Sequence, residues 1–140
     1  FIFNTMKKLL LALAVLSLSG CAAVDAVLMT KYDPNEYLLI SEIKVDARHY
    51  AQGCNNPLII LPNAQAMADK TELFEAYSEN LPRNGDGVKA AQALNEIAQG
   101  LEKAYLDPKG QPSAMFCKLK YSSIENSATV IQHVVGNRPR

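Results

Sequence analysis

Apolar residues recur at intervals of three and four positions in four stretches of this chain, and this spacing constrains its fold more than any other feature. A helix that carries such a stripe must bury it against another element. The connecting segments are short and contain Pro, Gly, Asn and Asp, which favour turns. The pattern therefore predicts an all-α fold, a compact antiparallel bundle of about four helices.

The first stripe begins after Asp33, which is an expected N-cap, with Pro34 as the first helical residue and Glu36 three positions after the cap. Gly53 is expected to end the first helix. The apolar face comprises Leu39, Ile40, Ile43, Ala47, Tyr50, Ala51 and Cys54.

The second stripe comprises Ala64, Met67, Phe74, Tyr77 and Leu81. Because of Pro62, this stripe belongs either to a helix that begins at about Pro62 after a short apolar turn or to a kinked helix. Thr71 is a candidate N-cap of a new helix if the stretch is interrupted there.

The third and fourth stripes follow two segments with clear turn composition, residues 82–87 and 107–112. Asp86 is a candidate cap for the third helix, whose face comprises Val88, Ala91, Leu94, Ile97, Ala98, Leu101 and Tyr105. The fourth helix is expected from about Ser113 to Gly136, followed by a loose tail. It should bury Met115, Cys117 or Leu119, Tyr121, Ile124, Ala128, Ile131 and Val135. Residues 115–121 and 128–135 also suit strands, so an α+β fold is the alternative.

The first 20 residues have the order of a secretory leader: Met6 and two lysines, an apolar run over residues 9–16, and small residues up to Gly20. The run is too short for a permanent span, which needs about 20 apolar residues. A leader of this kind predicts export of the segment that follows.

The four residues Leu18-Ser19-Gly20-Cys21 resemble the lipobox of bacterial lipoproteins. The resemblance implies that a signal peptidase reads Leu18, Ser19 and Gly20, removes residues 1–20, and leaves Cys21 carrying a diacylglyceryl group. Further acylation of the new amino end, with chains such as palmitate, would make binding persistent, because each buried methylene contributes about 0.8 kcal/mol. Ala22 in place of Asp resembles the pattern that enterobacteria release to the outer membrane. A secreted protein or an uncleaved signal anchor is the alternative.

Residues 21–32 are then expected to be a lipidated tether, and residues 33–140 a single periplasmic helical domain. Its two remaining cysteines predict a Cys54–Cys117 disulfide, since an exported domain meets an oxidising compartment. The alternative is a zinc site formed by these cysteines with His49 and His133, but no pair has the short spacing typical of zinc ligands.

The charges are balanced at 14 basic and 14 acidic residues, so we expect no nucleic-acid partner. No catalytic, metal-binding or phosphate-binding motif is recognisable, and we expect no cofactor besides the lipid. The leading hypothesis is a non-catalytic, lipid-anchored protein on the periplasmic face of a membrane, which acts through an envelope protein partner. Small lipoproteins of phages and mobile elements that exclude a second element have this general build.

Two other functions are kept as alternatives. Glu72, Glu75 and Glu79 share one helix side, and paired carboxylates can hydrolyse glycosides, so a peptidoglycan-acting enzyme or accessory is the first. The second is a binder of a small ligand or lipid, with a cavity lined by Ile43, Met67, Leu94 and Ile131.

Overall fold

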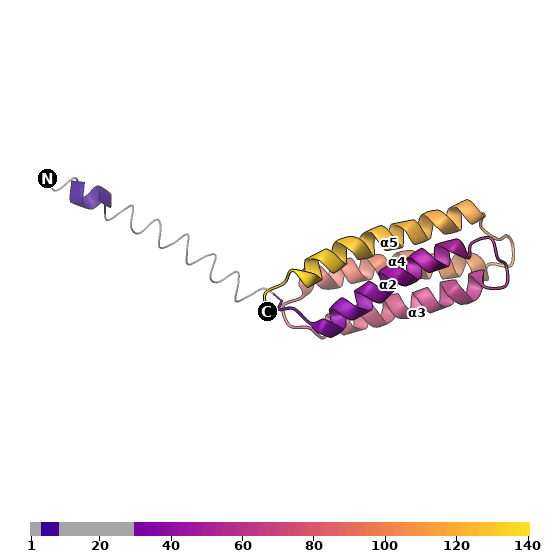
Figure 1. Ribbon diagram of the computed structural model, residues 1–140, viewed down its shortest axis with the longest axis horizontal. Coiled ribbons are helices and arrows are strands. Elements are labelled where there is room, and N and C mark those ends of the chain that lie inside the picture. Colours follow the sequence, from indigo (N-terminus) through magenta and orange to yellow (C-terminus); the bar gives the residue numbers. More distant parts are fainter. Residues whose placement is uncertain (1–3, 9–29) are drawn as a thin grey trace.

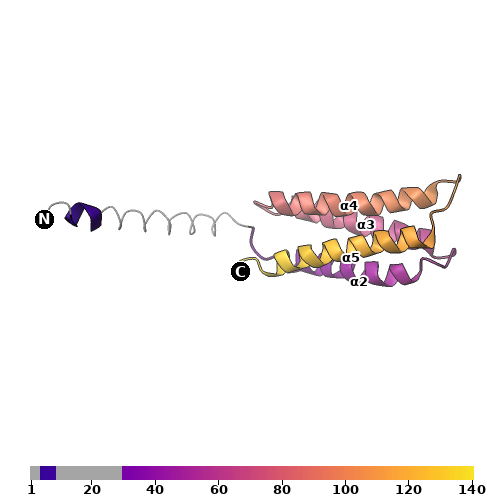
Figure 2. The ribbon, with the colours of Figure 1, turned by 90° about the horizontal axis from the view of Figure 1, so that it is seen from above.

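The computed structural model describes residues 4–8 and 30–140 of the chain (Figure 1). Residues 4–8 are helical, and the rest of the described chain forms four long helices: α2 (Pro34–Gln52), α3 (Ile60–Glu79), α4 (Gly85–Leu106) and α5 (Ala114–Gly136). Consecutive helices pack against one another, and α5 also packs along α2, which closes the ring. Figure 2 shows two layers, with α3 and α4 in one and α2 and α5 in the other.

This architecture confirms the predicted all-α antiparallel bundle. The described residues contain no strand, so the α+β alternative is wrong for this part of the chain. Within the same residues, no helix combines the length and hydropathy that crossing a membrane requires.

The start of α2 follows directly from its sequence. The Asp33 carboxylate accepts hydrogen bonds from the backbone amides of Asn35 and Glu36, both at 2.9 Å, and Pro34 occupies the first turn. Gly53 ends the helix as expected. These local contacts satisfy amides that a helix start would otherwise leave without partners.

Three expectations about the other helix ends need correction. α3 already begins at Ile60, because Pro62 falls in the first turn, where its missing amide has no helical acceptor to lose. The helix then continues through Thr71, whose hydroxyl donates to the carbonyl of Met67 at 3.1 Å instead of capping a new helix. The N-cap of α4 is Asn84 and not Asp86.

The core contains the interior side of all four stripes. Its buried members from α2, α3, α4 and α5 include Ile40, Ile43, Met67, Phe74, Leu94, Leu101, Tyr121 and Ile124. Met115 is the exception to the predicted face, since its side chain is 64% exposed whereas Cys117 is buried. Two positions along a helix differ by about 200° in direction, so the two side chains cannot both face the interior. The disulfide decides in favour of Cys117.

Candidate functional site

The bundle has two chemically different ends. The α2–α3 and α4–α5 connections lie together at the end that we call the disulfide end, far from the C-terminus (Figure 1). Residues 30–33, the α3–α4 connection and the C-terminal tail lie at the other, which we call the terminal end. Each candidate site is therefore described by the end of the bundle at which it lies.

At the disulfide end, Cys54 and Cys117 form a disulfide with their Cα atoms 5.8 Å apart. This bond confirms the predicted pairing and joins the end of α2 to the first turn of α5. Because both sulfur atoms are bonded to each other, neither is available as a zinc ligand, so the zinc alternative is wrong. The described residues contain no group of three or more His, Cys, Asp or Glu that could hold a metal ion.

Tyrosines pack near the disulfide inside the bundle. The rings of Tyr50 and Tyr121 meet edge to face, with centroids 5.9 Å apart. The hydroxyl groups of Tyr105 and Tyr121 are buried and have no hydrogen-bond partner in the described part of the chain. Burial, with a smaller contribution from the neighbouring Tyr50 and Tyr105, raises the pKa of Tyr121 far above its usual value. These side chains therefore act as neutral packing groups, consistent with the place of Tyr50, Tyr105 and Tyr121 on the predicted apolar faces.

Four large apolar side chains at the disulfide end are exposed, and we call them the apolar tip: Leu58, Ile59, Leu106 and Met115. Leu58 is 84% exposed. Its backbone amide donates a hydrogen bond to the Asn56 side-chain oxygen at 3.0 Å. This bond closes a turn that fixes the backbone of Leu58. Gly53 lets Ile59 approach closely, because a Cβ at position 53 would lie 2.9 Å from Ile59 Cδ1. The α2–α3 connection, which carries Leu58 and Ile59 of the tip, is thus short and constrained, and Leu106 and Met115 lie at the adjoining ends of α4 and α5.

The terminal end contains a buried ion pair, which is the centre of what we call the terminal cluster: Glu36, Asn84 and Arg138. Arg138 Nη1 donates to Glu36 Oε1 at 2.6 Å, and the side chains are 8% and 1% exposed. Arg138 Nη2 donates to Asn84 Oδ1 at 2.8 Å. The Asn84 amide donates in turn to the carbonyl of Ser78 at 3.0 Å, so the cluster joins α2, the α3–α4 connection and the tail.

The tail is therefore not loose, contrary to the sequence prediction. Besides Arg138, the carbonyl of Pro139 accepts a hydrogen bond from the Tyr32 amide at 2.9 Å, and the Arg140 guanidinium lies 3.8 Å from the Tyr32 ring centroid. Thr30 donates to the carbonyls of Pro82 and Arg83. Composition suggested a disordered end because the partners are more than 50 positions away in the sequence.

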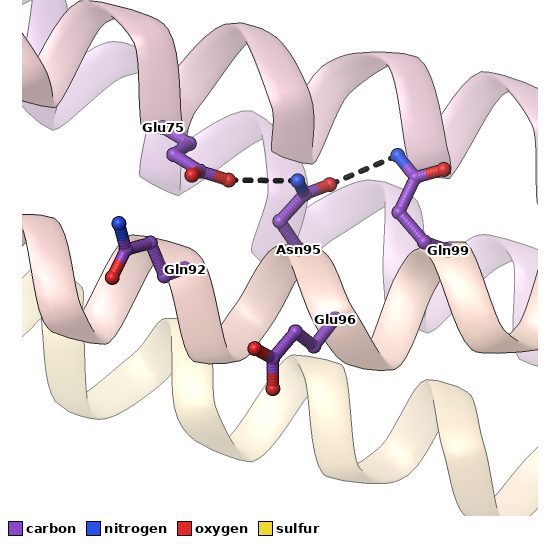
Figure 3. A pocket seen from close by; sticks show the side chains of 5 residues that line it. All are labelled: Glu75, Gln92, Asn95, Glu96 and Gln99. Carbon is purple, nitrogen blue, oxygen red and sulfur yellow. Dashed lines mark hydrogen bonds between the residues drawn. The ribbon is translucent and has the colours of Figure 1, made fainter.

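An open polar pocket lies between α3 and α4, lined by Glu75, Gln92, Asn95, Glu96 and Gln99 (Figure 3). Asn95 donates to Glu75 at 2.7 Å and accepts from Gln99 at 3.0 Å. Figure 3 shows that Glu75 points toward Asn95 and not toward Glu96. Of the predicted acidic run, Glu75 faces this pocket, whereas Glu72 and Glu79 are exposed. The run does not form an opposed carboxylate pair.

The remaining candidate residues are separated or fall outside the described chain. His49 is exposed near the end of α2, and His133 is exposed on α5 beside Asn137, so each imidazole lies on the protein surface. Ile43, Met67 and Leu94 are buried in the core, and Ile131 packs against it; none of the four lines the polar pocket. Leu18, Ser19, Gly20 and Cys21 lie outside the described residues.

Fold and site together define a disulfide-containing four-helix bundle with an apolar tip at one end and a buried ion pair at the other. Comparison of the chain with protein-family models, curated protein sequences and solved structures found no match.

Proposed function

We propose that this chain is a lipid-anchored, non-catalytic protein of the periplasmic face of a bacterial membrane, and that it acts by binding an envelope protein through its apolar tip. The observation that carries the proposal is the exposure of Leu58, Ile59, Leu106 and Met115 at one end of a constrained bundle. All four side chains lie at the same end of the bundle, and exposed apolar surface is typical of protein contacts.

The positions of the two ends support this arrangement. Residues 30–33, through which the chain leaves toward Cys21, lie at the terminal end, and the tip lies at the other (Figure 1). The longest helices have 22 and 23 residues, so they hold the tip about 33 Å from the terminal end at 1.5 Å per residue. A lipid on Cys21 would then leave the tip pointing away from the membrane and accessible to a partner.

The polar chemistry of the bundle also supports a structural rather than a catalytic role. The most deeply buried charges, Glu36 and Arg138, bind each other, and Glu75 is held by Asn95. Anchoring at a membrane and exclusion of a second phage or mobile element would both be compatible with a bundle that offers a binding surface.

The contact is tested by placing a photoreactive amino acid at position 58 of the full-length chain in the cell of origin. We expect an adduct of one envelope protein after illumination. The matched control carries the same amino acid at position 73, because Leu73 on α3 is 54% exposed but lies away from the tip. Equal adducts from both positions, or none from position 58, would contradict the proposal.

The anchor is tested separately. Cys21→Ser should move the chain from the membrane fraction to the soluble fraction, because the thioether-linked lipid can no longer form. Mass spectrometry of the unaltered mature chain should find a diacylglyceryl group on Cys21. An unmodified thiol at that position would exclude the anchor while leaving the tip contact to be decided by the first experiment.

A further inference from the structure

The two halves of the disulfide end differ in charge. Residues 49–68, which form the end of α2, the α2–α3 connection and the start of α3, contain no Asp, Glu, Lys or Arg. Residues 101–121, which form the corresponding part of α4 and α5, contain four lysines and two carboxylates: Glu102, Lys103, Asp107, Lys109, Lys118 and Lys120. The apolar tip therefore has a neutral side and a side with an excess of positive charge.

Three of the lysines are exposed next to the tip, and we call them the lysine rim: Lys103, Lys109 and Lys118. Lys103 lies three positions before Leu106, and Lys118 lies three positions after Met115. Residues at this spacing share one side of a helix, so each lysine accompanies a member of the tip. Lys109 lies in the connection between the two helices.

The other three charges of this half are less available. Lys120 is partly buried, and its amino group lies 5.5 Å from the ring centroid of Phe116 on the same helix. Asp107 accepts a hydrogen bond from the backbone amide of Lys109 at 2.9 Å, so its carboxylate turns toward the connection. Glu102 is partly buried. The charge offered beside the tip is therefore mainly positive.

The ammonium groups of the lysine rim form no ion pair with any residue that the structure describes. The nearest cation of the other half, Arg48, binds Glu125 at 3.0 Å, and Lys70 of α3 binds Asp46 at 2.8 Å. These two cations are already compensated within the bundle. The lysine rim is not, so its charges are free to meet carboxylates of another molecule.

We propose that the envelope protein bound by the apolar tip presents an apolar recess bordered by Asp and Glu side chains. The recess receives Leu58 and Ile59, and the carboxylates face the lysine rim. This inference rests on the proposed function and adds the chemistry of the partner. Opposite charges around an apolar contact speed the encounter and fix its orientation, because a bundle rotated about its long axis would move the lysines away from the carboxylates.

An acidic protein surface fits this end better than a bilayer of anionic lipid. Glu102 and Asp107 lie in the same half as the lysine rim. A protein can place carboxylates opposite the lysines alone, whereas a lipid surface with a uniform negative potential would also repel these two residues. The mixture of charges therefore favours a partner with fixed positions of charge.

The test measures the adduct formed through the photoreactive amino acid at position 58 when the full-length chain also carries a charge change, in the cell of origin. Lys103→Glu and Lys118→Glu should each lower the yield by roughly three- to tenfold, because a repulsion replaces an attraction. Lys89→Glu is the matched control and should leave the yield unchanged, since Lys89 is exposed on the same helix as Lys103 but near its start, at the terminal end.

Glu102→Gln provides a change of opposite sign. It removes a negative charge from the same half of the disulfide end and should raise the adduct yield, a gain that a folding defect cannot produce. Mass spectrometry of the adduct should place the attachment in a partner segment flanked by Asp or Glu.

The outcomes separate this inference from the proposed function. Equal yields from Lys103→Glu, Lys118→Glu and Lys89→Glu would overturn the acidic partner while the adduct itself still supports a protein contact. No adduct from the chain without a charge change would contradict the proposed function. An adduct of a phospholipid in place of a protein would show that the tip lies against a bilayer and would overturn both.

Discussion

Glu36 and Arg138 show how strongly the environment of a residue determines its effect on stability. Burial is the largest influence on Glu36 and raises the pKa of its carboxyl group above the ordinary 4.5, while the charge of Arg138 and the hydrogen bond from it act in the opposite direction. Glu36 Oε2 is buried and has no hydrogen-bond partner in the described part of the chain. The pair is therefore incompletely compensated, and losing one member should be worse than losing both.

We predict that Arg138→Met lowers the free energy of unfolding by about 3–5 kcal/mol at pH 7, because it leaves a buried carboxylate without its cation. In this variant the pKa of Glu36 in the folded state lies above that in the unfolded state. The folded state then binds the proton more tightly, so stability should rise as the pH falls from neutrality toward the ordinary pKa of a carboxyl group. Urea denaturation at a series of pH values measures both effects.

The double variant Glu36→Gln/Arg138→Met is the control for this prediction. It removes both charges, so it should be more stable at pH 7 than Arg138→Met alone and should lose the added pH dependence. If the double variant is the less stable of the two, the unpaired carboxylate of Glu36 does not cause the loss of stability in Arg138→Met, and Glu36 is not an incompletely compensated charge.

At the scale of the element, α4 contains glycines in opposite surroundings. A Cβ at Gly87 would lie 2.1 Å from Asn84 Oδ1 and 2.9 Å from Arg138 Nη2, whereas a Cβ at Gly100 would meet nothing within 4 Å. Gly87 therefore makes room for the terminal cluster. Gly100 lies on the exposed side of the helix, where glycine only adds backbone freedom to the unfolded chain.

The same substitution at these two positions should have effects of opposite sign. Gly87→Ala should destabilise the bundle by about 1–3 kcal/mol, since Asn84 or Arg138 must move. Gly100→Ala should stabilise it by about 0.5–1 kcal/mol, because alanine has the higher helix propensity. Thermal unfolding followed by circular dichroism compares the two variants. A gain of stability in both would show that Asn84 and Arg138 leave room for a methyl group at position 87.

Element boundaries could be predicted from the sequence where a local signal decides them. Asp33, Pro34 and Gly53 mark the ends of α2 through caps and backbone geometry, and α4 ends at Leu106, directly before the predicted turn. The prediction that Met115 is buried was wrong. The side of α5 that faces inward is fixed by the disulfide between Cys117 and Cys54, which lies far away in the sequence.

At the scale of the whole molecule, the disulfide connects residues 63 positions apart and limits the unfolded chain. A closed loop of that length stabilises a folded protein by on the order of 4 kcal/mol in the chain-entropy model, out of the 5–15 kcal/mol typical of a domain. The rest of the stability must come from the apolar core, which extends over all four long helices.

We predict that Cys54→Ala/Cys117→Ala lowers the free energy of unfolding by up to about 4 kcal/mol without abolishing the helical fold. The same loss should follow when the unaltered chain is denatured with a reductant present. Denaturation curves with and without reductant measure it, and the double variant should be insensitive to the reductant. A reductant effect of the same size in the double variant would mean that another bond or thiol is responsible.

The sequence by itself determined the four helices, the turns between them and the pairing of the two cysteines, because stripe periodicity, caps and cysteine number are local or compositional signals. The tertiary structure alone decided that Glu36 meets Arg138, that Glu75 is held by Asn95, and that the apolar tip remains exposed. The partners in these contacts are 20 to 102 positions apart, and no short-range pattern specifies which helix faces bring them together.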